Sequence, residues 1–209
     1  MQTMSLSAFD PPYVSELEQI FAWSALKYFD EKNAFAKQRE IVTCCGNFIL
    51  DFFVATPSKK IGFECDGKEF HDFRRDEFRD AAILETGEVD IIFRLPGSAL
   101  FYHTDDVFYL LSVWHAELFT TRGLTGLKTL SSDAARLAAK AIDDTGTRIY
   151  YRDTEAGIGH VERIWRRSLK YFDFPRNISK HYSNYLLNCG MRNLDEAIEG
   201  YDKKIFNGW

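Results

Sequence analysis

The sequence predicts an α/β fold in which helices cover the faces of a mixed β-sheet. A segment of helical periodicity at 14–29 comes first, and residues 37–66 then hold three strand-like runs separated by turn residues. A polar helical segment at 72–86, a strand at 89–95 and a helix at 105–119 follow in that order. Because a strand–helix–strand passage joins parallel strands, whereas a meander is antiparallel, the predicted sheet contains both kinds of pairing.

The first helix is predicted by a wide apolar face and by a start signal. Apolar residues recur at helical spacing between Val14 and Tyr28. Ser15 and Glu18 have the spacing of a capping box, in which a serine side chain accepts a hydrogen bond from the backbone three residues on. Glu18 therefore has a structural explanation before any functional one.

The three strand-like runs form a predicted meander. They cover residues 37–43, 48–55 and 60–66, and the middle run is rich in Phe, Ile, Leu and Val. Residues 45–47 and 56–59 contain Gly, Asn, Pro and Ser, which favour turns. Short antiparallel strands joined in this way lie side by side, so residues from neighbouring runs are expected to meet.

The chain is predicted to divide near residue 120. Gly123 and Gly126 indicate a linker at 120–131, so we expect an α/β core at 1–120 and a mainly helical, basic region at 121–209. The segments predicted after the linker are helices near 132–142, 159–172, 178–189 and 194–206, with a short strand at 148–151.

Composition indicates a soluble globular protein. The 209 residues are 45% hydrophobic and 27% charged, which suffices for a core without disulfides or a structural metal. No run of about 18 apolar residues is present, and the N-terminus lacks the pattern of a secretory signal, so we expect a cytoplasmic protein and no membrane partner. None of the four cysteines forms a CxxC pair, so reduced thiols are expected rather than a zinc site.

Charge is distributed unevenly along the chain. The formal net charge of −5 gives no general signal for nucleic-acid binding. Residues 1–121 hold 11 basic and 20 acidic residues, whereas residues 122–209 hold 15 basic and 11 acidic residues. The split suggests an acidic catalytic part and a more basic companion.

Carboxylates stand inside the second and third strand-like runs. Strict alternation places Asp51 on the face of Ile49 and Phe53, and it places Glu64 on one face with Asp66. A carboxylate in an apolar run is costly unless it is paired or binds a metal. Converging acids repel each other until a cation neutralises them, and their oxygens suit Mg²⁺ or Mn²⁺. Ordinary ion pairs or polar strand ends are the alternative explanation for each acid taken singly.

Several short motifs stand in a defined order along residues 14–115. They are Ser15-Glu16-Leu17-Glu18, then Gln38, Phe48-Ile49-Leu50-Asp51-Phe52, Phe63-Glu64-Cys65-Asp66-Gly67 with His71, Asp76-Glu77-Phe78-Arg79 with Leu84, and Ile91-Ile92-Phe93-Arg94. This series resembles the PD-(D/E)XK nuclease superfamily, and within it the branch of very-short-patch-repair-like endonucleases. The resemblance covers about half of the chain and implies a restriction-endonuclease-like core that hydrolyses phosphodiester bonds.

The resemblance also implies roles for individual residues. Asp51 and Glu64 are the implied ligands of Mg²⁺, with Mn²⁺ as a substitute, and Asp66 assists them. Glu18 is implied to position metal-bound water. Asp66 stands where the superfamily name puts lysine, which leaves His71 as the candidate general base or phosphate contact. A histidine at a helix start with no catalytic task is the alternative.

Further basic and polar residues surround these motifs. Lys68 follows the third strand-like run and is a candidate phosphate contact. Arg79 and Arg94 are expected to brace the site or pair with acids, and either is a candidate phosphate contact as well. Gln38 is a candidate hydrogen-bond donor near the metal, or else a solvated residue at a strand start.

The basic C-terminal region holds a predicted amphipathic helix at 160–172. One face would carry Arg163, Arg166, Arg167 and Lys170, which are candidates for binding nucleic-acid phosphates. A solvated face of a small helical region is the alternative.

The sequence thus predicts a Mg²⁺-dependent endodeoxyribonuclease, with DNA favoured over RNA as its partner. Two other classes stay open: a catalytically inactive nucleic-acid-binding module, and a subunit that needs a partner protein or a second copy to cut.

Overall fold

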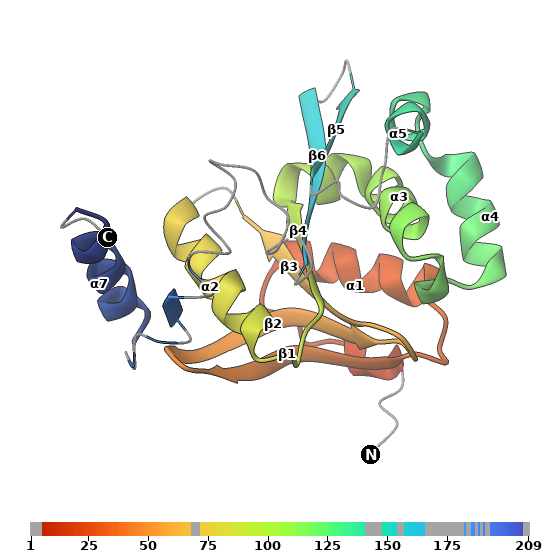
Figure 1. The fold of residues 1–209 in the computed structure, drawn as a ribbon. Coiled ribbons are helices and arrows are strands. Elements are labelled where there is room, and N and C mark those ends of the chain that lie inside the picture. Colours follow the sequence, from red (N-terminus) through yellow and green to blue (C-terminus); the bar gives the residue numbers. More distant parts are fainter. Residues whose placement is uncertain are drawn as a thin grey trace.

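The computed structural model describes most of the 209-residue chain (Figure 1). The described residues are 6–67, 72–140, 148–153, 157–165, 182, 185, 186, 188, 190 and 193–206. None of the helices within these ranges is long and apolar enough to cross a membrane.

A six-stranded sheet has the order β1-β2-β3-β4-β6-β5. The strands are β1 Ala34–Thr43, β2 Gly46–Ala55, β3 Lys60–Asp66, β4 Ile91–Pro96, β5 Arg148–Asp153 and β6 Gly157–Trp165. The strands β1, β2 and β3 form an antiparallel meander, and β4 pairs with β3 in parallel. The strand β6 pairs antiparallel with β4, and β5 pairs antiparallel with β6. The sheet is therefore mixed, as the sequence predicts.

Helices cover both faces of this sheet. They are α1 Glu16–Tyr28, α2 Phe73–Glu85, α3 Gly97–Trp114, α4 Thr121–Leu130, α5 Asp133–Ala139 and α7 Leu194–Phe206, with short 3-10 turns η1 Leu6–Phe9 and η2 Ala116–Leu118. In Figure 1, α1, α3, α4 and α5 lie on one side of the sheet, and α2 and α7 lie on the other. Ser15 caps α1 by accepting a hydrogen bond from the backbone N–H of Glu18, which confirms the start predicted for this helix.

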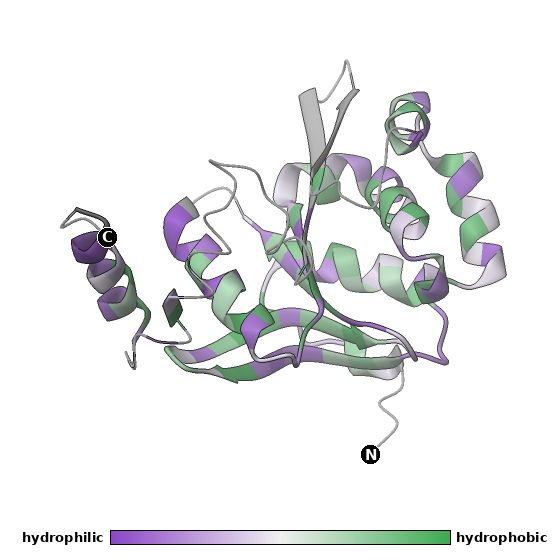
Figure 2. Cartoon of the chain, in the orientation of Figure 1, coloured by the Kyte–Doolittle hydropathy of each residue, from purple (hydrophilic) through white to green (hydrophobic). Residues whose placement is uncertain are grey.

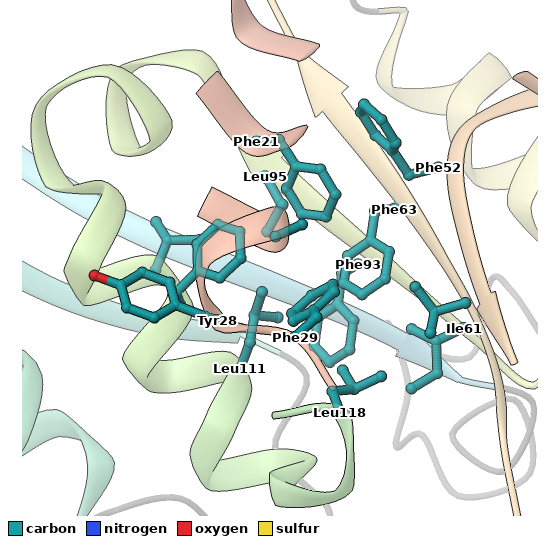
Figure 3. Packing of buried hydrophobic residues seen from close by; sticks show 14 of the residues in the cluster. Phe21, Tyr28, Phe29, Phe52, Ile61, Phe63, Phe93, Leu95, Leu111 and Leu118 are labelled. Atoms are coloured by element: carbon teal, nitrogen blue, oxygen red, sulfur yellow. The ribbon is translucent and has the colours of Figure 1, made fainter. Parts of the chain in front are cut away.

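An aromatic core lies between the sheet and the helices α1 and α3. Phe21 of α1 is fully buried, and its ring centroid lies 4.7 Å from that of Phe52 and 5.0 Å from that of Phe63. Phe63 in turn stacks on Phe93 of the parallel strand β4 (Figure 3). Burying such rings removes large apolar areas from water, which fixes β2, β3 and β4 beneath the helices.

A second apolar cluster fills the space under α2. Leu50, Ile83 and Ile92 are fully buried there. The helix α2 is hydrophilic in its first turns and hydrophobic toward its C-terminal end (Figure 2). The later turns of α2, with Ile83 and Leu84, therefore pack on the sheet.

The prediction of a linker at 120–131 is wrong. Residues 121–130 form α4, whose N-cap Thr120 accepts a hydrogen bond from the backbone N–H of Gly123. Gly123 lies against the first helix: a Cβ added to it would come within 2.6 Å of the Tyr28 carbonyl oxygen. The glycine permits close helix packing, so it does not mark a flexible connection.

The predicted helix at 159–172 is also wrong over its first part, where residues 157–165 form β6. Because β6 pairs with β4, the chain beyond residue 120 adds strands to the sheet of the predicted core. A mainly helical region at 121–209 is thus corrected to a mixed one, which ends in the predicted helix α7. The backbone of residues 157–165 forms its hydrogen bonds with β4 and β5, and the local pattern of side chains does not predict the long-range pairing with β4.

The end of the chain packs on α2. Phe78 of α2 stacks on Tyr182 at 3.6 Å between ring centroids, and Tyr201 of α7 meets Phe78 edge-on at 5.3 Å. Arg74 and Arg75 of α2 form ion pairs with Asp202 and Asp195 of α7, respectively. The helix α2 is therefore held between the sheet and α7.

Candidate active site

Asp51 and Glu64 lie on neighbouring strands at the same level of the sheet. The β2–β3 register pairs Phe53 with Gly62 and Phe52 with Phe63, and one further step brings Asp51 beside Glu64. The Asp51 carboxylate accepts a hydrogen bond from the backbone N–H of Cys65 at 2.8 Å. This bond ties Asp51 to β3 one residue beyond Glu64.

Strict alternation of side chains does not hold through Asp51. Leu50 and Phe53 both pack in the cluster under α2, whereas Phe52 and Val54 face the aromatic core on the other side. The alternation that the sequence predicts is therefore interrupted between Leu50 and Phe52, next to Asp51. Asp51 lies where the strand changes faces, and charges from both sides reach it: Glu18 of α1 and Arg79 of α2 each influence its pKa.

The neighbouring strand is irregular at the same level. The β1–β2 register pairs Lys37 with Phe52 and Arg39 with Leu50, so Gln38 lies across from Asp51. Gln38 has a φ of 49°, in the left-handed region that residues other than glycine rarely adopt. Such strain persists only where the surroundings fix it, and it is concentrated at functional sites.

Glu18 is held at the same place by the start of α1. Its side chain is 5% exposed and accepts hydrogen bonds from Val14 N at 3.3 Å, from Ser15 Oγ at 3.4 Å and from Gln38 Nε2 at 3.2 Å. Its charge contributes to the raised pKa of Asp51. Glu18 therefore performs the predicted helix-capping task and also faces the candidate ligands.

Glu64 is buried and pairs with an arginine of α2. Its residue exposure is 7%, and Arg79 Nη2 donates to Glu64 Oε1 at 2.7 Å. Burial raises the pKa of Glu64 to about 8, against the opposing effect of Arg79 and with a further rise from Asp51. Burial also raises the pKa of Asp51 to about 6, although the Cys65 N–H opposes this shift.

Asp66 is engaged differently, because Arg94 holds it. Arg94 Nη1 lies 2.9 Å and 3.2 Å from the two carboxylate oxygens of Asp66. The same guanidinium donates to both oxygens of Asp80 on α2, at 2.7 Å and 3.0 Å, and lies 3.5 Å from Asp76. Burial by itself lowers the pKa of Arg94, but these carboxylates outweigh it and raise the pKa.

Asp51 and Glu64 keep oxygen atoms that are open to a further ligand. Asp51 Oδ1 and Glu64 Oε2 have no hydrogen-bond donor among the described residues. Two carboxylate oxygens suit Mg²⁺, which keeps several of its waters and needs few protein ligands. Within the described ranges, no group of three or more His, Cys, Asp or Glu side chains has the arrangement of a metal site.

Several predicted site residues lie outside the described residues, or their side chains do. These are Lys68, His71, Arg166, Arg167 and Lys170.

Arg163 differs from the expectation of an exposed phosphate-binding face. It lies on β6 and is 3% exposed, with its guanidinium carbon 4.8 Å from the ring centroid of Trp114. Because the side chain is enclosed by the fold, Arg163 is corrected from a surface contact to a buried one.

Asp80 of α2 is the part of the site that the sequence motifs do not include. Asp76, Arg79 and Asp80 stand at positions i, i+3 and i+4, so they share one face of the helix. That face meets Arg94 and Glu64 of the sheet. Helical spacing alone could have grouped the three, but only the fold shows which strand residues they meet.

A scan against protein-family models, and searches of curated proteins and of solved structures, found no match to this chain.

Proposed function

We propose that this chain is a divalent-metal-dependent endonuclease that hydrolyses DNA phosphodiester bonds, with Asp51 and Glu64 as the metal ligands. One observation carries the proposal. The buried carboxylate of Glu64 and the partly buried carboxylate of Asp51 come from adjacent strands and lie at one level of the sheet, and each keeps an oxygen with no donor among the described residues. Burial of two such groups is costly, and a cation between them offsets both desolvation and repulsion.

The chain's own residues fix the ligand pair in position. The Cys65 N–H orients the Asp51 carboxylate, and Arg79 orients that of Glu64, so one oxygen of each group is held and the other is available. A bound divalent cation would activate a water molecule and stabilise charge on the phosphate. Glu18, held by Gln38 and by the start of α1, is the candidate group for orienting that water.

In the proposed site, Asp66 is a nearby charge and not a primary metal ligand. Both of its oxygens accept hydrogen bonds from Arg94, and its charge adds to the rise in the Asp51 pKa. With several acids close together, the site repels a nucleic-acid phosphate until a cation is bound. Substrate binding is therefore expected to depend on the metal.

A catalytically inactive nucleic-acid-binding module is the second candidate. It is favoured by the acid at position 66, where the resemblance expects lysine, and by the pairing of this acid with Arg94.

A nicking assay on supercoiled plasmid separates the two candidates. The wild-type chain is expected to nick DNA with Mg²⁺ or Mn²⁺ and to lose this activity with a chelator or in Asp51→Asn. Asp133→Asn removes the same charge at an exposed position of α5 and should leave nicking unchanged. Binding of DNA without cleavage of DNA or RNA under any of these metals would favour the inactive module instead.

A further inference from the structure

Of the three nitrogens of the Arg79 guanidinium, Nη2 alone donates hydrogen bonds to described residues. Its Nη2 donates to Glu64 Oε1 and to the Ile49 carbonyl oxygen of β2, each at 2.7 Å. These two bonds use both hydrogens of Nη2 and fix the plane of the group between β2 and β3. The carboxylates of Glu64 and Asp80 raise the pKa of Arg79 against the lowering effect of burial, so the group stays a cation.

The other two nitrogens of this guanidinium have donors to spare. An arginine carries five N–H donors, and three of them belong to Nε and Nη1. Among the described residues, no acceptor lies within hydrogen-bond distance of either nitrogen; Asp80 Oδ1 approaches Nη1 only to 3.7 Å. The Arg79 side chain is 17% exposed. Nε and Nη1 are not among the side-chain atoms that are fully buried and lack a hydrogen-bond partner.

Arg94 provides the contrast within the same network. All three of its guanidinium nitrogens donate to carboxylates of Asp66 and Asp80, and its side chain is 9% exposed. Arg94 is thus saturated and enclosed. Of the two guanidiniums beside the candidate ligands, Arg79 is the one that can still accept an anionic partner.

We propose that Arg79 anchors the nucleic-acid phosphate while it holds Glu64. Its Nη2 keeps the Glu64 carboxylate in place, and its Nη1 donates to an oxygen of a phosphodiester group. Because the guanidinium is planar and carries its donors on three nitrogens, one group can serve both partners in a fixed arrangement. The inference rests on the proposed function and adds to it a residue that joins the ligand pair to the substrate.

The test compares Arg79→Gln with a charge-matched control on the same helix. Arg75→Gln removes one positive charge from α2 at a surface position, where the guanidinium pairs with Asp195 and is 47% exposed. Binding of a short fluorescein-labelled DNA duplex is measured with Ca²⁺ over a series of salt concentrations, and a gel confirms that the duplex is intact. Arg79→Gln should weaken binding about tenfold and reduce the slope of log K against log salt by about one. Arg75→Gln should change neither quantity.

Metal binding, measured by calorimetry without nucleic acid, separates this inference from the proposed function. Arg79→Gln is expected to retain Mn²⁺ binding, whereas Asp51→Asn is expected to lose it. Wild-type affinity and salt slope in Arg79→Gln would overturn the inference and leave the proposed function standing. Loss of Mn²⁺ binding in this variant would also overturn the inference, because it would indicate that Arg79 acts through Glu64 alone. A wild-type chain that binds no divalent cation would instead remove the proposed function.

A conservative variant covers the case in which Arg79→Gln does not fold. Arg79→Lys keeps the charge but replaces three donor nitrogens by one, which cannot hold Glu64 and also reach the phosphate, so a several-fold loss of DNA affinity with little change in salt slope is expected. Wild-type affinity in Arg79→Lys would overturn the inference.

Discussion

Burial of Asp51 and Glu64 controls how both carboxyl groups titrate. The folded-state pKa of Asp51 is raised from 3.8 to about 6, and that of Glu64 is raised from 4.5 to about 8. Between the lower and the upper value, each group binds more protons in the folded than in the unfolded chain. By linkage, the unfolding free energy then falls as pH rises through these windows. Without metal, the two groups therefore favour the folded state most below about pH 4 and least above about pH 8.

The direction of this pH dependence predicts how removal of the Asp51 charge changes the unfolding free energy. In the presence of a chelator, Asp51→Asn should raise the unfolding free energy at pH 8 by on the order of 1–2 kcal/mol and have little effect at pH 4. Urea denaturation at several pH values measures the change, with Asp133→Asn as an exposed control. A loss of stability at pH 8 would mean that the folded protein favours the ionised Asp51 without a metal.

Arg94 is predicted to stabilise the fold more than any surface arginine does. Arg94→Met leaves the buried carboxylate of Asp80 without its guanidinium, which should cost about 3–5 kcal/mol in urea denaturation. Arg39→Met removes an exposed pair with Glu88 and should cost at most about 1 kcal/mol. Equal effects of the two substitutions would contradict this assignment.

At the scale of elements, local signals were sufficient for the first part of the chain. The Ser15–Glu18 cap, the meander turns and the apolar strand residues are all short-range features, and the structure has the corresponding elements. The register that brings Asp51 beside Glu64 follows from the hairpin. The break in alternation next to Asp51 does not, because it accompanies an irregular β1–β2 pairing that includes the unusual backbone of Gln38.

Long-range pairing explains the errors farther along the chain. Residues 157–165 carry charged and apolar residues on both alternating faces, so neither a period of 2 nor one of 3.6 dominates. Pairing with β4 decides the outcome and encloses Arg163 beside Trp114. The partners of Arg94 were hidden for a similar reason, because Asp80 and Asp66 meet it only after α2 packs on the sheet.

Substitution by alanine is predicted to have opposite effects on stability at the two glycines of α4. In Gly123→Ala the new Cβ would lie 2.6 Å from the Tyr28 carbonyl oxygen, so overpacking should outweigh the better helix propensity and cost about 1–3 kcal/mol. Gly126 has open space around the same position, and Gly126→Ala should stabilise by about 0.5–1 kcal/mol. Chemical denaturation of the two variants tests this, and a gain of stability in Gly123→Ala would refute the close-packing explanation.

At the scale of the whole molecule, the end of the chain supports the helix that carries half of the candidate site. The helix α2 presents Arg79 and Asp80 to the sheet, while its opposite side meets Tyr182 and Tyr201. The residues of the site are thus buttressed by segments more than 100 positions away in sequence. Two ion pairs between α2 and α7 are exposed and contribute little, so the aromatic contacts are expected to dominate this support.

Tyr201→Ala is therefore predicted to loosen α2 as well as α7. Tyr201 is 5% exposed, and its ring meets Phe78 at 5.3 Å and Tyr182 at 4.9 Å, so truncation should cost about 3 kcal/mol. Hydrogen exchange should accelerate in peptides from α2 and α7 but remain unchanged in those from α1, whose contacts lie on the opposite side of the sheet. Faster exchange in α7 with unaltered protection of α2 would show that the sheet alone holds α2. Faster exchange in both helices would show that the aromatic contacts of α7 help to hold Arg79 beside Glu64.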